Sequence, residues 1–103
     1  MPNEEILLIK DRIVDQLSPL RIYLFGSCAC GTPSPDSDYD SYIVVGDDKT
    51  DWHEQTVKAY RAIRPVRTRP VDILAGTASD FEKRKTHSSI EKEVAEKGML
   101  LYG

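Results

Sequence analysis

Three short apolar runs, separated by stretches with other periodicities, constrain the fold of this chain most strongly. The runs are "RIYLF" (21–25), "YDSYIVV" (39–45) and "VDILA" (71–75), and each has the length and composition of a strand. Residues 21–25 are nearly continuously apolar, which is typical of a central strand covered on both faces. A chain of 103 residues has room for a single core, so we expect one domain over residues 1–103.

Two long helices are predicted before the third run. The first covers residues 4–17 with Asn3 as its N-cap, and the second covers residues 51–63. The second helix ends because residues 64–70 contain two prolines. The expected buried faces are Ile6, Ile9, Ile13 and Leu17 in the first helix, and Trp52, Thr56, Ala59, Tyr60 and Ile63 in the second.

After residue 75 the sequence carries two capping boxes, Ser79-x-x-Glu82 and Ser88-x-x-Glu91. The second predicts a helix with Ile90 and Val94 facing the core and Gly98 as a left-handed stop. "MLLY" (99–102) either adds an edge strand or only packs its side chains. The pattern predicts an α/β (α+β) domain, a small mixed sheet of three or four strands packed against helices.

Composition and charge exclude several classes of protein. No stretch approaches the ~20 apolar residues that a membrane span needs, and the N-terminal "MPNEEILLIK" is acidic where a secretory signal would be basic. A net charge of −3 argues against extended nucleic-acid binding. We therefore expect a cytoplasmic protein without a membrane partner, and self-association remains open.

Two aspartates, Asp38 and Asp40, stand one residue apart where the second run begins. A strand places residues i and i+2 on one face, so their carboxylates would point together. Two neighbouring carboxylates repel each other, so the pair does not stabilise the fold. A hard cation such as Mg²⁺ removes this repulsion when it binds them.

A third acid, Asp72, lies inside the apolar run 71–75. An uncompensated carboxylate in a central strand is costly, so we expect a partner for it. If runs 39–45 and 71–75 are neighbours, Asp72 completes a three-acid cluster with Asp38 and Asp40. Such a cluster fits two metal ions around a phosphoryl group.

The pair Gly26-Ser27 ends the first run. Gly26 lets the backbone approach a ligand closely, and Ser27 begins a turn whose free N–H groups can hold a phosphate. The segment from Gly26 to Asp40 therefore predicts a phosphate at one end and metal ions at the other.

These residues carry a resemblance to a known family. "LFGSCACGTPSPDSDYDSYIVV", followed by "RPVDILAG", resembles the minimal nucleotidyltransferases of the DNA polymerase β superfamily. Their signature is Gly-Ser, ten residues, Asp-x-Asp and one later acid on a strand. The positions that match are Gly26, Ser27, Asp38, Asp40 and Asp72. The ending "TASDFEKRKTHSSIEKEVAEKGMLLYG" is also similar, so the resemblance covers essentially the whole chain.

The resemblance implies the polymerase-β-type nucleotidyltransferase fold. It also implies Mg²⁺-dependent transfer of a nucleoside monophosphate from ATP or another NTP to a hydroxyl, and AMP is the group we expect to be transferred. Asp38 and Asp40 would bind two Mg²⁺ ions. Asp72 would bind the catalytic ion and favour deprotonation of the attacking hydroxyl. Gly26 and Ser27 would hold the β and γ phosphates.

The resemblance also implies a partner, because many such proteins are encoded beside a HEPN-domain toxin and some add AMP to a tyrosine of that toxin. The expected role is therefore the antitoxin of a toxin–antitoxin pair. Two alternatives stay open. One is a non-catalytic nucleotide-binding module that inhibits its partner by occlusion, and the other is a small-molecule nucleotidyltransferase of the antibiotic-modifying type.

Two further features bear on this expectation. Cys28 and Cys30 stand where family members often carry an arginine, which implies a weaker hold on the triphosphate. A basic cluster precedes the Asp72 strand and is either a solvated helix end or a surface for an acidic partner or nucleotide phosphates. The cluster consists of Arg61, Arg64, Arg67 and Arg69.

Overall fold

The structure, a computed structural model, describes residues 4–25, 39–48, 51–67, 71–87 and 90–103. Its elements in chain order are α1 (Glu4–Leu17), β1 (Arg21–Phe25), β2 (Tyr39–Val45), α2 (Trp52–Ile63), β3 (Val71–Thr77), α3 (Ala78–Arg84), α4 (Ile90–Lys97) and β4 (Met99–Tyr102).

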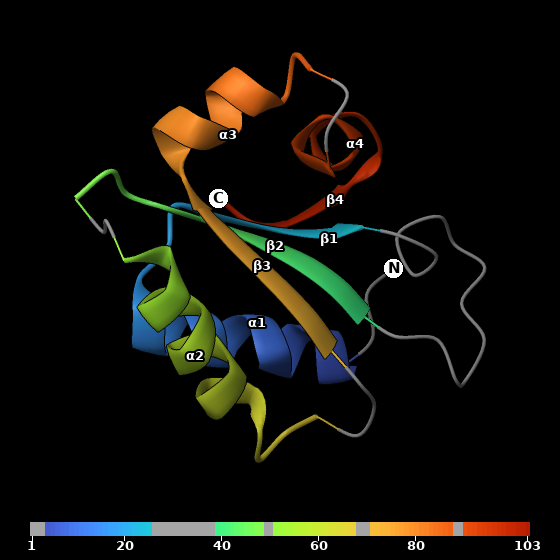
Figure 1. The fold of residues 1–103 in the computed structure, drawn as a ribbon. Helices are drawn as coiled ribbons and strands as arrows, with labels where there is room; N and C mark the ends of the chain where they lie inside the picture. The colour runs from blue at the N-terminus through green and yellow to red at the C-terminus, as the bar shows by residue number, and fades with distance from the viewer. Residues whose placement is uncertain (1–3, 26–38, 49–50, 68–70, 88–89) are drawn as a thin grey trace.

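The strands form one mixed sheet in the order β3-β2-β1-β4. β1 is antiparallel to both β2 and β4, whereas β2 and β3 are parallel and are joined through α2. Figure 1 shows α1 and α2 on one face of the sheet and α3 and α4 on the other. The predicted mixed sheet is confirmed, β1 is a central strand, and residues 99–102 form one of the two edge strands.

The face under α1 and α2 holds the larger core. The apolar face predicted for α1 is buried as expected. Of the side chains predicted to face inward from α2, Ala59 and Ile63 are buried and Thr56 is half-buried, but Tyr60 is partly exposed. The side chain of Trp52 and the predicted cap Asn3 lie outside the part of the chain that the structure describes.

The face under α3 and α4 holds a smaller, more aromatic cluster. Phe81 of α3 stacks on Tyr23 with ring centroids 5.5 Å apart and meets Tyr42 at 5.4 Å. Val94 of α4 joins this cluster and is fully buried, as predicted. Ile90 is 40% exposed, so its predicted place in the core is wrong.

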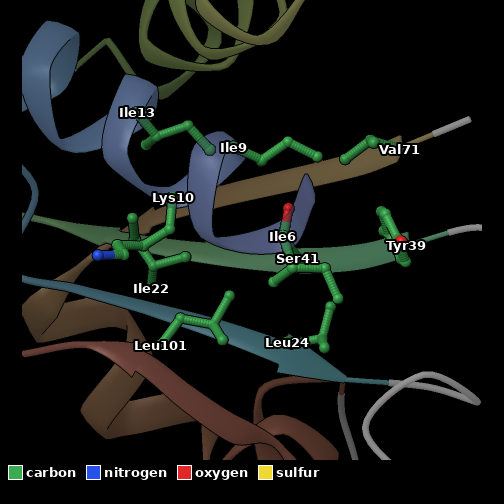
Figure 2. Close-up of a pocket in the computed structure, with 10 residues that line it drawn as sticks. All are labelled: Ile6, Ile9, Lys10, Ile13, Ile22, Leu24, Tyr39, Ser41, Val71 and Leu101. Carbon is green, nitrogen blue, oxygen red and sulfur yellow. The ribbon is translucent and has the colours of Figure 1, made fainter. Parts of the chain in front are cut away.

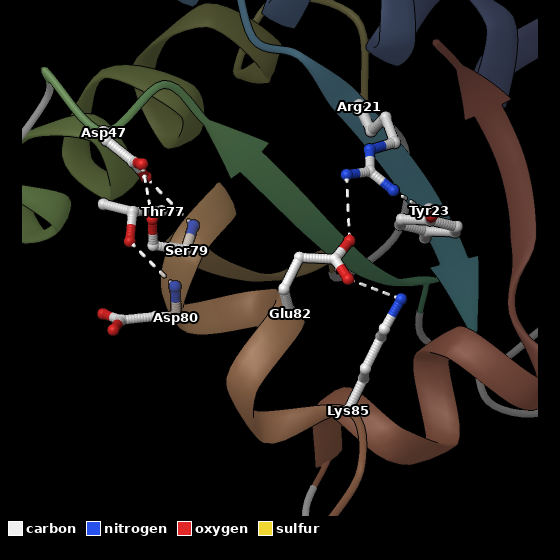
Figure 3. A network of polar contacts seen from close by, with 8 residues as sticks. All are labelled: Arg21, Tyr23, Asp47, Thr77, Ser79, Asp80, Glu82 and Lys85. Atoms are coloured by element: carbon white, nitrogen blue, oxygen red, sulfur yellow. Dashed lines mark hydrogen bonds and ion pairs between the residues drawn. The ribbon is translucent and has the colours of Figure 1, made fainter.

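The start of α3 differs from the predicted capping box. β3 extends to Thr77, which is the N-cap, and its Oγ1 accepts a hydrogen bond from the Asp80 N–H (3.3 Å). Ser79 already lies inside the helix, and its backbone N–H and hydroxyl donate to Asp47 at the end of β2, as Figure 3 shows. The box at Ser79 is therefore wrong because a long-range partner takes its side chain.

The end of α4 also differs from expectation. Gly98 is not among the residues with positive φ, so it is no left-handed stop. Its N–H donates to the Val94 carbonyl (2.9 Å), and a Cβ at this position would collide with that carbonyl oxygen. Glycine is required by this close approach instead. The predicted cap Ser88 lies outside the described ranges.

Within the ranges given above, no helix has the length and apolar content needed to span a bilayer.

Candidate functional site

Asp40 and Asp72 lie opposite each other in the parallel pair of β2 and β3. Each is the second residue of its strand, so both carboxylates lie at the same end of the sheet. Neighbouring strands are roughly 5 Å apart, and register partners point to the same face. The condition set for an acid cluster, that these two strands are neighbours, is met, and their pairing brings together two acids that are 32 residues apart in sequence.

Alternation along the strands fixes which face the acids occupy. Tyr39, Val71 and Ile73 belong to the core under α1 and α2. Asp40 and Asp72 alternate with them and therefore point to the opposite face, the one that carries α3 and α4.

The acid pair lies where that second face is left uncovered. Phe25, the register partner of Asp40 on β1, is buried against the α3/α4 cluster. Moving outward across the sheet, Asp40 is half-buried, Asp72 is exposed, and Leu74 on the same face of β3 is 38% exposed. The face therefore opens progressively from β1 to β3, and the acids stand in its open part.

Asp72 does not occupy the central strand that the sequence suggested. β3 is an edge strand, and the Asp72 side chain is exposed. The expected burial cost therefore does not arise, because water reaches this carboxylate. The acid pair follows from the register of the strands and not from compensation of a buried charge.

Hydrogen bonds on the helix side hold the backbone around the acids. Ser41 Oγ donates to the Asp72 carbonyl (3.2 Å), which ties β2 to β3 one residue beyond Asp40. The Tyr60 hydroxyl of α2 accepts a bond from the Ile73 N–H (3.0 Å). These two hydrogen bonds lie on the face opposite to the carboxylates and hold the backbone that fixes the spacing of Asp40 and Asp72. Sequence reasoning missed Tyr60 in this role, although a tyrosine on an otherwise apolar helix face signals a hydroxyl that needs a partner.

Several predicted site residues lie outside the described ranges. They are Gly26, Ser27, Cys28, Cys30, Asp38 and, from the basic cluster, Arg69. The chain enters the segment 26–38 from Phe25 and leaves it at Tyr39, so both ends of the segment adjoin Asp40. Among the residues that are described, no three acidic, histidine or cysteine side chains gather to hold a metal. The two described carboxylates are oxygen donors of the kind that Mg²⁺ prefers.

A cavity between α1 and the sheet is not the site. Figure 2 shows it lined mainly by aliphatic side chains, with Tyr39, Ser41 and Val71 among the residues around it. Its volume is about 10 Å³, room for one water at most. It also lies on the face opposite to Asp40 and Asp72.

Comparisons with known proteins agree with this geometry. Residues 7–100 match the family model described as "Nucleotidyltransferase domain". A search of curated proteins finds no match.

Three solved structures share the fold. One is a protein from Sulfolobus solfataricus assigned as a nucleotidyltransferase, with TM-score 0.63, 19% identity, and coverage of 94% of this chain and 76% of that chain. The second is a toxin–antitoxin determined with AMP-PNP, with TM-score 0.56, 25% identity, and coverage of 98% and 74%. The third is a mutant of the toxin–antitoxin MntA-HpeT, with TM-score 0.57, 22% identity, and coverage of 98% and 74%.

Proposed function

The chain belongs to the nucleotidyltransferase domain family, and on that basis we propose that it transfers AMP from ATP to a hydroxyl of a partner protein, as a single domain over residues 1–103. The observation that carries the proposal is the register pairing of Asp40 with Asp72 on an open face of the sheet. A family match alone names a fold and a class of reaction, whereas paired carboxylates supply the groups that this reaction needs.

The proposed metal ligands are Asp38, Asp40 and Asp72, which would hold two Mg²⁺ ions. Asp40 and Asp72 fit this role because they stand side by side and are reached by solvent. When bound, Mg²⁺ offsets the negative charge of the triphosphate and of the hydroxyl oxygen as it attacks.

In the proposed reaction, the acceptor oxygen forms a bond to the α-phosphorus of ATP. The bond from that phosphorus to the bridging oxygen breaks, and pyrophosphate leaves with the electron pair. The proton of the hydroxyl passes to solvent, and Asp72, on the edge strand β3, favours this deprotonation. Backbone N–H groups at Gly26 and Ser27 would hold the β and γ phosphates, as a glycine-containing turn does in other phosphate sites.

The proposed partner is a HEPN-domain toxin, and the proposed acceptor is one of its tyrosines. Two of the structural relatives are toxin–antitoxin proteins, and one of these was determined with the ATP analogue AMP-PNP. The other carries two aspartate-to-glutamate substitutions one residue apart, the spacing of Asp38 and Asp40 here. By this analogy the chain is a cytoplasmic antitoxin.

Label transfer from α-³²P-ATP tests the proposal. Wild type, Asp40→Asn and Asp72→Asn are incubated with Mg²⁺ and the purified product of the adjacent gene. Asp48→Asn is the matched control, because Asp48 is an exposed aspartate at the opposite end of β2. We expect a labelled partner with wild type and the control, and at least about 100-fold less label with either site variant, as for loss of a group that stabilises a transition state.

Label that persists in both site variants would contradict the role of the acid pair. A partner that is inhibited equally by wild type and by Asp40→Asn, without label, would favour occlusion. Transfer only to a small-molecule hydroxyl would favour the antibiotic-modifying alternative.

A further inference from the structure

Arginine side chains from two helices gather where α2 ends. Arg61 lies in the last turn of α2, Arg64 is its C-cap, and Arg67 lies in the turn that follows; all three are exposed. Arg12 of α1 reaches the same helix end, where its Nε donates to the Ala62 carbonyl (3.0 Å). These four arginines are called the arginine surface below.

The arginine surface adjoins the outer edge of β3 beside Asp72. Tyr60 of α2 bonds the backbone of Ile73, the residue that follows Asp72. Arg64 is four residues after Tyr60, so it lies about one helical turn, roughly 6 Å, further along the same side of α2. In Figure 1, α2 ends on the side of the molecule where β3 starts. The surface therefore lies next to the edge strand that carries Asp72, in the helix layer of α1 and α2, while the Asp72 carboxylate points to the other face of the sheet.

Within the described residues, internal ion pairs do not account for the charges of Arg61 and Arg64. Elsewhere in the molecule, Lys58 pairs with Glu54, and Arg21 pairs with Glu82. In the part of the chain that the structure describes, neither Arg61 nor Arg64 has a carboxylate partner. Positive charge concentrated on a chain of net charge −3 points to a ligand from outside.

Resting on the proposed function, we propose that the arginine surface docks an acidic segment of the protein that presents the acceptor hydroxyl. Guanidinium groups bind carboxylates through two parallel hydrogen bonds, which fixes orientation as well as position. Docking beside β3 would bring a hydroxyl of the same partner to the open face at Asp72.

An acidic protein segment fits this surface better than a nucleic acid does. Nucleic-acid binding gains affinity by neutralising many phosphates along an extended strand. The arginine surface is compact, and α1 and α2 also carry acidic side chains, among them the exposed Asp11, Asp15 and Glu54. A short run of glutamates or aspartates matches this size, whereas a long polyanion would meet those acids.

The test uses two fluorescein-labelled probes, a short peptide of about six glutamates and an oligouridine of about twenty nucleotides. Binding is followed by fluorescence anisotropy at low salt. Wild type is compared with the double variant Arg61→Glu/Arg64→Glu. The matched control is Lys83→Glu/Lys97→Glu, which makes the same change in net charge at exposed positions on α3 and α4.

We expect wild type to bind the glutamate peptide more tightly than oligouridine. The arginine variant should lose about tenfold or more in affinity for the peptide, and the lysine control about twofold or less, since charge reversal at a contact outweighs a change in net charge. Equal losses in both variants, tighter binding of oligouridine, or no binding of the peptide by wild type would overturn the proposal.

A parallel measurement separates this surface from the proposed reaction. The rise in melting temperature on adding ATP and Mg²⁺ reports on the acid pair, and we expect it to be the same in wild type and both double variants. A missing rise in wild type would count against the proposed function, whereas the peptide result bears on the arginine surface itself. Circular dichroism of each variant verifies that a loss of binding is not a loss of fold.

Discussion

The two faces of the sheet are made from alternate residues of the same strands, yet they differ in how completely they are covered. Under α1 and α2, Ile13, Ile43 and Ile63 have no exposed surface. On the face that carries α3 and α4, Phe25 is buried, whereas Asp40 and Asp72 on the next two strands are accessible to solvent. One face supplies most of the core, and the other combines a smaller core with the candidate site.

Helix length explains the difference. α1 and α2 have 14 and 12 residues, whereas α3 and α4 have 7 and 8. At 1.5 Å per residue, the first two are about 21 and 18 Å long and the last two about 10 and 12 Å. A strand of seven residues spans about 23 Å, so α1 and α2 nearly match it and α3 and α4 do not. The short helices bury fewer residues of their face than α1 and α2 do.

The sharpest test of this comparison is truncation of one aliphatic side chain on each face. Ile13→Ala should lower the free energy of unfolding by about 3 kcal/mol, because Ile13 is fully buried in the larger core. Leu74→Ala, on the open part of the other face, should cost about 0.5 kcal/mol. Urea denaturation measures both. Similar losses would mean that the second face is as closed as the first.

A second test concerns the polar contact that holds α4 over the sheet. The Tyr42 hydroxyl donates to Glu91 Oε2 (2.9 Å), and Arg84 lies 4.0 Å from the same oxygen. Burial, followed by the bond to Glu91, raises the pKa of Tyr42, so the phenol stays protonated and remains a donor. Tyr42→Phe leaves the 6%-exposed Glu91 without this donor and should cost about 1–2 kcal/mol.

Tyr23→Phe is the matched control for Tyr42→Phe. The Tyr23 hydroxyl only accepts a bond from the partly exposed Arg21 (3.2 Å), so its loss should cost less than about 0.5 kcal/mol. Chemical denaturation at neutral pH compares the two. If Tyr42→Phe is no worse than Tyr23→Phe, the contact with Glu91 does not stabilise α4.

The smallest expected effect concerns Asp47, which connects the end of β2 to the start of α3 (Figure 3). The hydroxyl and then the backbone N–H of Ser79 lower the pKa of Asp47 in the folded state. A lowered folded-state pKa stabilises the protein above the unfolded-state pKa, near 4, and this contribution disappears as the pH falls through the folded-state value.

Asp47→Asn should therefore lower the melting temperature slightly at pH 7 and leave it nearly unchanged near pH 3. Melting curves between pH 3 and pH 7 measure the difference. Part of the acid sensitivity should remain in the variant, because Lys85 and Arg21 also lower the pKa of Glu82. A variant with the full pH dependence of wild type would contradict the role of Asp47.

Local patterns were sufficient to predict most of the helices and strands, and they made the pairing of the acids conditional on the order of the strands. Apolar periodicity located α1 and α2 to within a residue, and apolar runs located all three predicted strands. The neighbouring positions of Asp40 and Asp72 followed from requiring a partner for each acid. The premise that Asp72 is buried was wrong, because the order of strands in a sheet depends on tertiary packing.

The errors near α3 and α4 have the same origin. The spacing of Ser79 to Glu82 predicts that Ser79 is the N-cap of a helix. In the structure Thr77 is the N-cap, and Ser79 instead donates to Asp47, which is 32 residues away in sequence. Ile90 follows the helical period and is still exposed, because α4 is short and reaches only part of its face of the sheet. The predictions for Gly26, Ser27 and Asp38 concern residues outside the described ranges and stay predictions.

The hydrogen bond from the Ile73 N–H to Tyr60 also bears on aggregation. An edge strand presents backbone donors that can pair with a strand of another molecule. On β3, the phenol of α2 already occupies the donor that directly follows Asp72. A strand of another molecule that paired with β3 at this point would first have to displace Tyr60. Tyr60 therefore protects the backbone of β3 from intermolecular pairing, while the side chain of Asp72 stays accessible to solvent.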